Sequence, residues 1–167
     1  MKHPVELEES QLLAQCTIQR TRRGGPGGQH RNKVESAIVI THEPTGIIGQ
    51  ASERRSQHEN RDVAIDRLRL NLALGFRLET DQDRSPSELW RSRVRKQRLS
   101  LNAKHADFPL ILAEALDFIA AFEFDLAAVA KKLDISTSQL VKLLKSVPAA
   151  LEGVNRERRA RELHPYK

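Results

Sequence analysis

The sequence predicts an α+β fold in which one long helix packs on a small antiparallel or mixed sheet, followed by a small all-α unit with a helix-turn-helix-like pattern. Residues 36–42 and 47–52 carry the alternation of paired strands. Residues 56–76 repeat apolar side chains at helical spacing, and every periodic segment after residue 107 is helical. Because one helix can cover one face of a small sheet, we expect the first domain to span residues 11–80. A basic connector helix is expected over residues 81–106, and a helical C-terminal unit with a basic tail over residues 107–167.

Three strands are predicted for the sheet. Residues 1–10 are acidic and are expected to fray, and residues 12–19 are predicted as the first strand. The second strand, residues 36–42, alternates so that two isoleucines share one face. Pro-Thr-Gly at residues 44–46 supplies the fixed and the permissive φ angles of a hairpin turn. The chain therefore returns as a third strand over residues 47–52.

The long helix has a start signal and an end signal. Ser56 followed three residues later by Glu59 is a capping box. Gly75 stands near the predicted end, as glycine often does at helix C-termini. The apolar stripe between them consists of Ile65, Leu68, Leu72 and Phe76.

The connector also contains a helix start signal. Ser85 with Glu88 forms a second capping box, with Pro86 at the first helical position. We expect a basic helix to follow, which either contacts RNA or presents an ordinary solvated face. Its candidate RNA-binding residues are Arg91, Arg93, Arg95, Lys96 and Arg98.

The C-terminal region is predicted to be entirely helical. Leu110, Ile111, Ala115, Phe118 and Phe122 mark one amphipathic helix, with Pro109 near its start. Residues 126–144 then have the apolar spacing with which a helix-turn-helix closes two helices on each other: Ala130, Leu133, Ile135, Leu140 and Leu143. Asp134 occupies the turn position where such motifs usually carry glycine, and Ser136 with Gln139 caps the second helix.

Composition and charge restrict the possible functions. The chain of 167 residues is 39% hydrophobic, enough for a real core, and carries a net charge of +6. The excess lies in residues 1–104, because residues 105–167 contain nine cations and nine acids. Such a basic surface favours a polyanionic partner. The single cysteine, Cys16, excludes an intramolecular disulfide and lacks the neighbours of a zinc site, so no metal and no cofactor are expected.

The sequence carries no sign of export or of a membrane span. Residues 1–10 lack the apolar core of a secretory signal. The most apolar stretch, residues 108–130, is interrupted by four carboxylates. We therefore expect a soluble, cytoplasmic monomer without membrane contact.

The loop between the first two strands, "RRGGPGGQH", is the most unusual segment. A flexible spacer rarely joins two strands of one sheet, and a phosphate-binding loop would need Lys-Ser/Thr or G-x-G-x-x-G. Four glycines instead remove every Cβ around a tip and allow positive φ, so that backbone amides can approach a ligand. Gln29 stands at this tip. Its carbonyl can orient water and its backbone N–H can donate to developing negative charge.

These residues resemble a known family. "GGPGGQHRNKVESAIVITHEPTGI" together with "ERRSQHENRDVAIDRLR" is similar to the peptidyl-tRNA hydrolysis domain of class I peptide-chain release factors and their ribosome-rescue relatives. The resemblance covers residues 12–80. It combines Gly-Gly-Gln with the following His30, Asn32 and Lys33, the "THEPTGI" turn and the "RSQHENR" helix entry.

The resemblance implies hydrolysis of the peptidyl-tRNA ester in the large ribosomal subunit, which makes the protein a peptidyl-tRNA hydrolase acting with the ribosome. Its catalytic residues would be Gly27, Gly28 and Gln29, with ribosomal RNA supplying much of the site. His30 and Asn32 would shape the loop. A glutamine methyltransferase that modifies Gln29 is a further implied partner. The residues expected to contact RNA phosphates around the loop are Arg20, Arg22, Arg23, Arg31 and Lys33.

The chain departs from the stop-codon readers. Only eleven residues precede the first predicted strand, so we expect no stop-codon-recognition domain and a similarity to the short, codon-independent rescue factors. Residues 107–167 would act as a structural or ribosome-docking unit, or as a nucleic-acid reader whose basic run Arg156, Arg158, Arg159 and Arg161 grips phosphates. The alternative from another class is a non-catalytic RNA- or DNA-binding protein whose glycine loop is only a backbone clamp.

Overall fold

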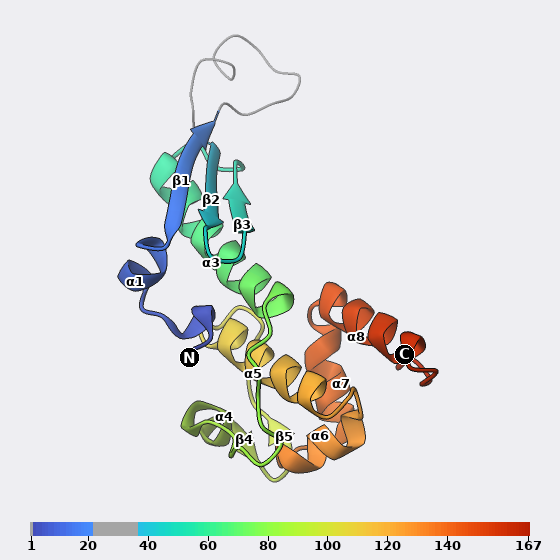
Figure 1. The fold of residues 1–167 in the computed structure, drawn as a ribbon. Coiled ribbons are helices and arrows are strands. Elements are labelled where there is room, and N and C mark those ends of the chain that lie inside the picture. The colour runs from blue at the N-terminus through green and yellow to red at the C-terminus, as the bar shows by residue number, and fades with distance from the viewer. Residues whose placement is uncertain (1, 22–36) are drawn as a thin grey trace. The chain divides into compact units, whose positions relative to one another are not determined.

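The computed structural model of the chain describes residues 2–21 and 37–167. It divides into two compact units, residues 2–76 and residues 77–167 (Figure 1). The first unit mixes helices and a sheet, and the second is mainly helical, so the predicted α+β class is confirmed.

The first unit contains one three-stranded antiparallel sheet. Its strands β1 (Cys16–Thr21), β2 (Ala37–His42) and β3 (Ile47–Ala51) lie in the order β1-β2-β3. The helix α3 (Gln57–Gly75) packs against β2 and β3, and Ile38 and Ile40 of β2 are buried on that side. Ser56 caps α3 as predicted, accepting a hydrogen bond from the Glu59 backbone N–H at 3.4 Å.

The N-terminal segment differs from the prediction of a frayed end followed by a strand. It forms a short 3-10 helix, η1 (Pro4–Glu6), and the helix α1 (Glu9–Leu13), so the strand begins four residues later than expected. Arg69 of α3 donates to the carbonyls of Val5 and Leu7 at 2.8 and 3.0 Å, which holds the segment on α3. Leu12 is fully buried. The prediction of a strand over residues 12–19 rested on local alternation, which does not reveal contacts with a residue more than 50 positions away.

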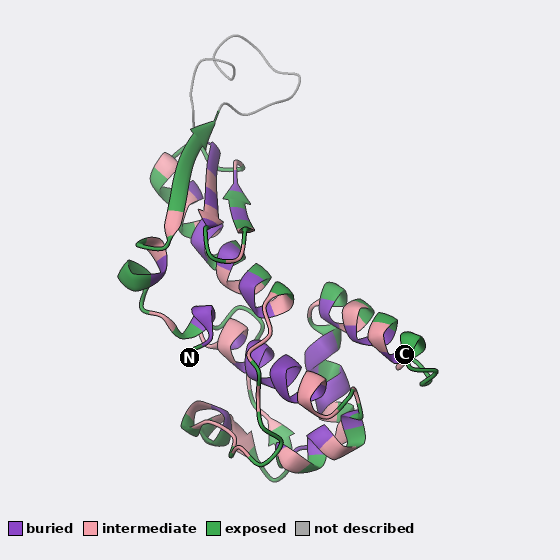
Figure 2. Cartoon of the chain, in the orientation of Figure 1, coloured by how far each residue is buried: buried purple, intermediate pink, exposed green. Residues whose placement is uncertain are grey.

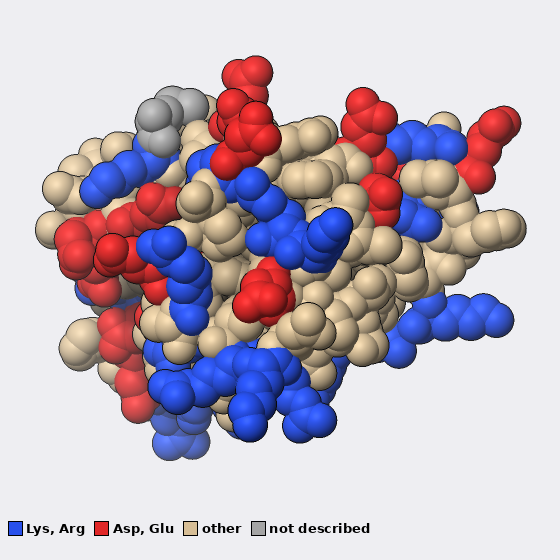
Figure 3. Space-filling model, turned by 90° about the horizontal axis from the view of Figure 1, so that it is seen from below, with Lys and Arg blue, Asp and Glu red and all other residues tan. Residues whose placement is uncertain are grey.

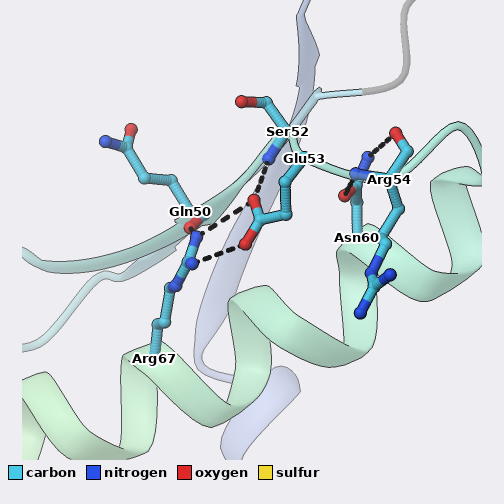
Figure 4. A network of polar contacts seen from close by, with 6 residues as sticks. All are labelled: Gln50, Ser52, Glu53, Arg54, Asn60 and Arg67. Atoms are coloured by element: carbon cyan, nitrogen blue, oxygen red, sulfur yellow. Dashed lines mark hydrogen bonds and ion pairs between the residues drawn. The ribbon is translucent and has the colours of Figure 1, made fainter.

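A polar network fixes the turn between β3 and α3 (Figure 4). The Glu53 carboxylate accepts hydrogen bonds from the Ser52 backbone N–H at 2.9 Å and from the Arg67 guanidinium at 2.5 Å. Arg67 also donates to the Gln50 carbonyl at 2.8 Å. Buried Asn60 closes the other side of the turn, because its side chain both accepts from the Arg54 N–H and donates to the Arg54 carbonyl. Strand, turn and helix are thereby joined independently of the hydrophobic core.

The second unit is built around the helix α5 (Phe108–Ala121), which is buried along most of its length (Figure 2). The helices α6 (Leu126–Lys132) and α7 (Thr137–Lys145) form the predicted helix-turn-helix pair, followed by α8 (Pro148–Ala160). Ser136 caps α7 by accepting from the Gln139 N–H at 3.2 Å. All five predicted apolar positions of the pair are buried: Ala130, Leu133, Ile135, Leu140 and Leu143.

The basic connector helix predicted over residues 81–106 is wrong for most of that range. The helix α4 (Glu88–Arg93) ends after six residues, and a two-stranded hairpin follows, β4 (Val94–Arg95) and β5 (Arg98–Leu99). Lys96 and Gln97 have φ of 48° and 59°, the two positive values that a tight type I′ turn requires. Such turns favour Asn-Gly, and Lys-Gln gives no comparable signal in the sequence.

The start of α4 was also misassigned. Ser87, and not Ser85, is the N-cap, since its hydroxyl oxygen accepts from the Trp90 backbone N–H at 3.0 Å. Ser87 itself donates from its backbone N–H and its hydroxyl to the buried Glu114 carboxylate, at 2.7 and 2.6 Å. This tertiary contact selects the later serine.

Candidate functional site

The candidate site is defined by the way the sheet holds the connection between β1 and β2. The last residue of β1, Thr21, pairs with the first residue of β2, Ala37. The two residues that border positions 22–36 in sequence, Thr21 and Ala37, therefore stand side by side at one end of the sheet (Figure 1). The predicted catalytic residues Gly27, Gly28 and Gln29 belong to this connection and lie outside the described residues. The same is true of Arg22, Arg23, Arg31 and Lys33.

The two strands that border this connection differ in pairing and burial. β2 is the central strand, paired on both sides and covered by α3, and Ile38 and Ile40 are 3% and 0% exposed. Among the described strands, β1 pairs only with β2, at the edge of the sheet, and it is exposed from Thr17 onward. Arg20, one residue before the end of β1, is exposed and pairs with Ile38. A cation therefore stands beside the start of the connection.

The opposite end of the sheet is tied by a buried histidine. His42, the last residue of β2, contacts the Thr45 hydroxyl through Nδ1 at 2.8 Å and the Gln15 side-chain carbonyl through Nε2 at 3.0 Å. Burial lowers the pKa of His42, which favours the neutral imidazole. The Glu43 backbone N–H also donates to the Gln15 carbonyl at 3.0 Å. These contacts join the start of β1 to the β2–β3 turn, so His42 has a structural role.

Cys16 stands close to this histidine in the sheet register but is not set up as a nucleophile. Cys16 pairs directly with His42, yet its thiol donates to the Leu12 carbonyl at 3.1 Å. Burial, and secondly the charge of Glu43, raise the pKa of Cys16, which suppresses the reactive thiolate. Both groups stand at the end of the sheet opposite Thr21 and Ala37. Neither His42 nor Cys16 is therefore placed at the end of the sheet where the predicted catalytic connection begins and ends.

The predicted RNA-binding residues of the second unit fall into two groups. Arg91, Arg95, Lys96 and Arg98 are exposed on α4 and the hairpin, whereas Arg93 forms an ion pair with Asp107. Arg156, Arg159 and Arg161 are exposed on α8 and just after it. In Figure 3 many of the Lys and Arg side chains on the visible face gather in groups, with acidic side chains between them.

Arg158 is a structural residue and leaves the proposed RNA-contacting set. It is 8% exposed, and its guanidinium donates to the His164 carbonyl at 2.8 Å and to the Phe124 carbonyl. The same group lies 4.6 Å from the centroid of the Tyr166 ring. Burial and these partners hold the guanidinium within the unit, so little of it is presented to an external phosphate.

The described ranges contain neither a candidate metal site nor a candidate membrane span. Within residues 2–21 and 37–167, no group of three or more His, Cys, Asp or Glu side chains is arranged to hold a metal ion. Nor does any helix in these ranges have the length and apolar character needed to span a membrane.

Comparison with known proteins identifies similar sequences. The family model described as RF-1 domain matches residues 5–107. The chain is 52% identical over 68 residues to peptide chain release factor 1 of Caldicellulosiruptor saccharolyticus, which covers 41% of this chain and 18% of that protein. It is 48% identical over 68 residues to peptide chain release factor 2 of a Sulfurovum species, again 41% of this chain and 18% of the relative. It is 59% identical over 51 residues to peptide chain release factor 2 of an Acidovorax species, 30% of this chain and 14% of the relative. The matched part thus spans less than a fifth of each of these relatives.

Proposed function

The chain belongs to the class I peptide-chain release factor superfamily through its RF-1 domain, and on this premise we propose that it releases nascent chains from stalled ribosomes without reading a codon. Proteins of this family act on the ribosome, where they promote hydrolysis of peptidyl-tRNA. We propose a cytoplasmic location and a monomeric state for the protein. Its proposed substrate is the ester between a peptide and the terminal adenosine of tRNA.

One observation carries the proposal. The Gly-Gly-Gln sequence lies in the connection between two strand ends that pair directly, Thr21 with Ala37. One member of that pair is β2, the central strand of the sheet, which packs against α3. At the far end of the sheet, His42 contacts the Thr45 and Gln15 side chains. Because its two ends are fixed in a packed sheet, such a connection is suited to place Gln29 in a site formed by another molecule.

The proposed chemistry needs no titrating side chain from the protein. The Gln29 backbone N–H would donate to the negative charge that develops when water attacks the ester, and the Gln29 side chain would position that water. Gly27 and Gly28 would permit the close approach of backbone to substrate. Removing one such donor typically costs about 10²- to 10³-fold in rate.

The cations around the connection would guide its insertion. Arg20 stands exposed at the strand end, and Arg22, Arg23, Arg31 and Lys33 flank the glutamine in sequence. Phosphates of large-subunit ribosomal RNA are the proposed contacts, with the salt dependence of counterion release. We further propose that a glutamine methyltransferase modifies Gln29, which mass spectrometry of the protein from its native cell would detect as one added methyl group.

The codon-independent part of the proposal assigns targeting to the helical unit. The family model ends at residue 107, and the remaining residues form the helix-turn-helix pair with its flanking helices α5 and α8. We propose that this unit docks the protein on the ribosome, which would leave the hydrolysis domain free of any need for codon contacts.

The deciding experiment measures release of labelled peptide from purified ribosomes stalled on an mRNA without a stop codon. Wild type should release the peptide. Gly28→Ala, which adds a Cβ where the backbone must approach the substrate closely, and Gln29→Ala, which removes the water-positioning side chain, should each reduce the rate about 100-fold or more while ribosome binding is unchanged. Gly153→Ala is the matched control, because a Cβ at Gly153 meets nothing within 4 Å. Release that requires a stop codon in the A site would contradict codon independence alone. Binding without release by any variant would instead support the non-catalytic RNA-binding alternative.

A further inference from the structure

The hairpin that replaces the predicted basic helix concentrates positive charge. Residues 91–106 contain six Lys and Arg residues and no Asp or Glu. Five of them are exposed: Arg91, Arg95, Lys96 and Arg98 on α4 and the hairpin, and Lys104 after it. We call residues 94–99, together with Arg91 three residues earlier in α4, the basic hairpin.

Two arginines of the basic hairpin stand directly opposite each other. Arg95 of β4 pairs with Arg98 of β5, and Val94 pairs with Leu99. Side chains directly opposite in an antiparallel pair have Cβ atoms about 5 Å apart, and like charges there are destabilising. Val94 and Leu99 are half-buried, so the alternation places the arginine pair on the outer face. An anion between the two guanidinium groups would remove their repulsion.

The fold itself leaves these charges uncompensated. Several arginines elsewhere in residues 77–167 are held by carboxylates, as Arg77 is by Asp117, Arg84 by Glu114 and Arg161 by Glu157. For Arg91, Arg95, Lys96 and Arg98, no side-chain hydrogen bond or ion pair with another described residue is present. Four such cations within eight residues favour an anionic partner outside the chain.

The turn of the basic hairpin is fixed beside the start of α7. The Ser136 backbone N–H donates to the Gln97 carbonyl at 3.2 Å, which joins the N-cap of α7 to the turn. The buried Trp90 indole donates to the Leu133 carbonyl at 2.8 Å and secures α4 to the same helix-turn-helix. Lys96 therefore lies next to the positive end of the α7 dipole. Two exposed acids border this surface in sequence, Glu88 three residues before Arg91 and Asp134 three residues before Thr137.

We propose that the basic hairpin and the first turn of α7 together bind the phosphate backbone of an RNA duplex. The choice of RNA over DNA rests on the proposed ribosomal function. A duplex is favoured over a single strand because single-strand sites depend on aromatic side chains that stack on bases, and the segments β4, β5 and α7 contain no aromatic residue. Duplex RNA is recognised mainly through its shape and its backbone.

The test measures binding of the full chain to a fluorescent 16-base-pair RNA duplex across a series of salt concentrations. Arg95→Gln with Arg98→Gln should weaken binding about tenfold and reduce the slope of log affinity against log salt by about 2, one counterion for each lost phosphate contact. Arg95→Lys with Arg98→Lys should retain most of the affinity, because a phosphate contact depends on charge more than on shape. The fluorescence of Trp90, the sole tryptophan, verifies that each variant is folded.

The matched control is Lys131→Gln with Lys145→Gln, which removes the same charge from exposed positions on α6 and in the last turn of α7. It should change duplex affinity less than threefold. An equal loss in the control would overturn the proposal, because binding would then follow total charge. Tighter binding to a DNA duplex of the same sequence would also overturn it. So would unchanged RNA binding by the hairpin variant together with weakened ribosome binding, an outcome that would indicate an acidic protein as the partner. None of these outcomes depends on hydrolysis, so the proposed catalytic activity is tested separately.

Discussion

Gly49 of β3 lies so close to Leu68 of α3 that no side chain fits between the strand and the helix. A Cβ at Gly49 would stand 2.5 Å from the Leu68 backbone N and 2.2 Å from the Ala64 carbonyl oxygen. Both are backbone atoms, so only movement of α3 could relieve the contact. Gly49→Ala should therefore destabilise residues 2–76 by about 3 kcal/mol, at the upper end of ordinary overpacking costs. Denaturant unfolding followed by circular dichroism measures this loss.

The control for this substitution is Gly153→Ala in α8. A Cβ there meets nothing within 4 Å, and alanine favours the helix over glycine by up to about 1 kcal/mol. The close packing of α3 on β3 would be contradicted if Gly49→Ala unfolded at the same denaturant concentration as wild type.

Asp117 should make the stability of residues 77–167 depend on pH. It is 3% exposed, and burial raises its pKa to about 6, although the Leu78 N–H at 3.0 Å and the Arg77 guanidinium act in the opposite direction. Between its ordinary pKa of 3.8 and about 6, the folded state binds more protons than the unfolded state. The free energy of unfolding should therefore fall as pH rises through this window, by up to about 3 kcal/mol.

The variant that checks this is Asp117→Asn. Asparagine keeps an oxygen to accept from Leu78 but does not titrate, so its unfolding free energy should be nearly flat from pH 4 to 6 where that of wild type falls. Urea unfolding followed by Trp90 fluorescence reports on this unit alone, because the chain has a single tryptophan. An unchanged slope in the variant would assign the pH dependence to other groups.

The sequence was most informative where local patterns and tertiary packing agree. The alternation in residues 37–42, the Ser56 cap and the helix-turn-helix spacing all reappear in the structure, because each depends on residues a few positions apart. The Gly-Gly-Gln motif was recognisable for the same reason, as an ordered local pattern. Gly75 shows the limit: it ends α3 without a positive φ, and a Cβ there would meet the Ile47 side chain at 2.9 Å.

Predictions failed where a distant contact decides the local structure. The cap of α4 is chosen by Glu114, 27 residues away, and the fully buried Leu12 belongs to a helix because Arg69 holds the N-terminal segment. The basic hairpin depends on positive φ at Lys96 and Gln97, which neither residue type favours. From the sequence, Arg158 was predicted to be an exposed, RNA-binding cation. The carbonyl of Phe124, to which it donates, is 34 residues away, so no local pattern indicates its burial.

Asp134 tests the helix-turn-helix geometry directly. Its φ of 54° is a left-handed conformation that aspartate tolerates better than alanine and less well than glycine. Asp134→Ala should lower stability by about 1 kcal/mol, whereas Asp134→Gly should leave it unchanged or raise it. Both variants remove the same carboxylate, so a difference in Tm between them isolates the backbone effect. Equal Tm values would contradict a strained turn.

Arg158 and Arg159 are neighbours in sequence, but their substitution should change the stability of the unit by very different amounts. Arg158 donates to two backbone carbonyls and lies over Tyr166, so Arg158→Gln should destabilise residues 77–167 by about 2–3 kcal/mol. Arg159 is exposed, and Arg159→Gln should change stability by less than about 0.5 kcal/mol.

The salt dependence of ribosome binding should also distinguish Arg158 from Arg159. If Arg159 contacts phosphate, Arg159→Gln should lower the salt dependence of ribosome binding by about one counterion, which is the effect of losing one phosphate contact. Arg158→Gln should leave that slope unchanged at temperatures where the variant remains folded, because its guanidinium is already occupied by carbonyls. A slope that falls with Arg158→Gln but not with Arg159→Gln would mean that the end of α8 rearranges on the ribosome and releases the buried guanidinium to RNA.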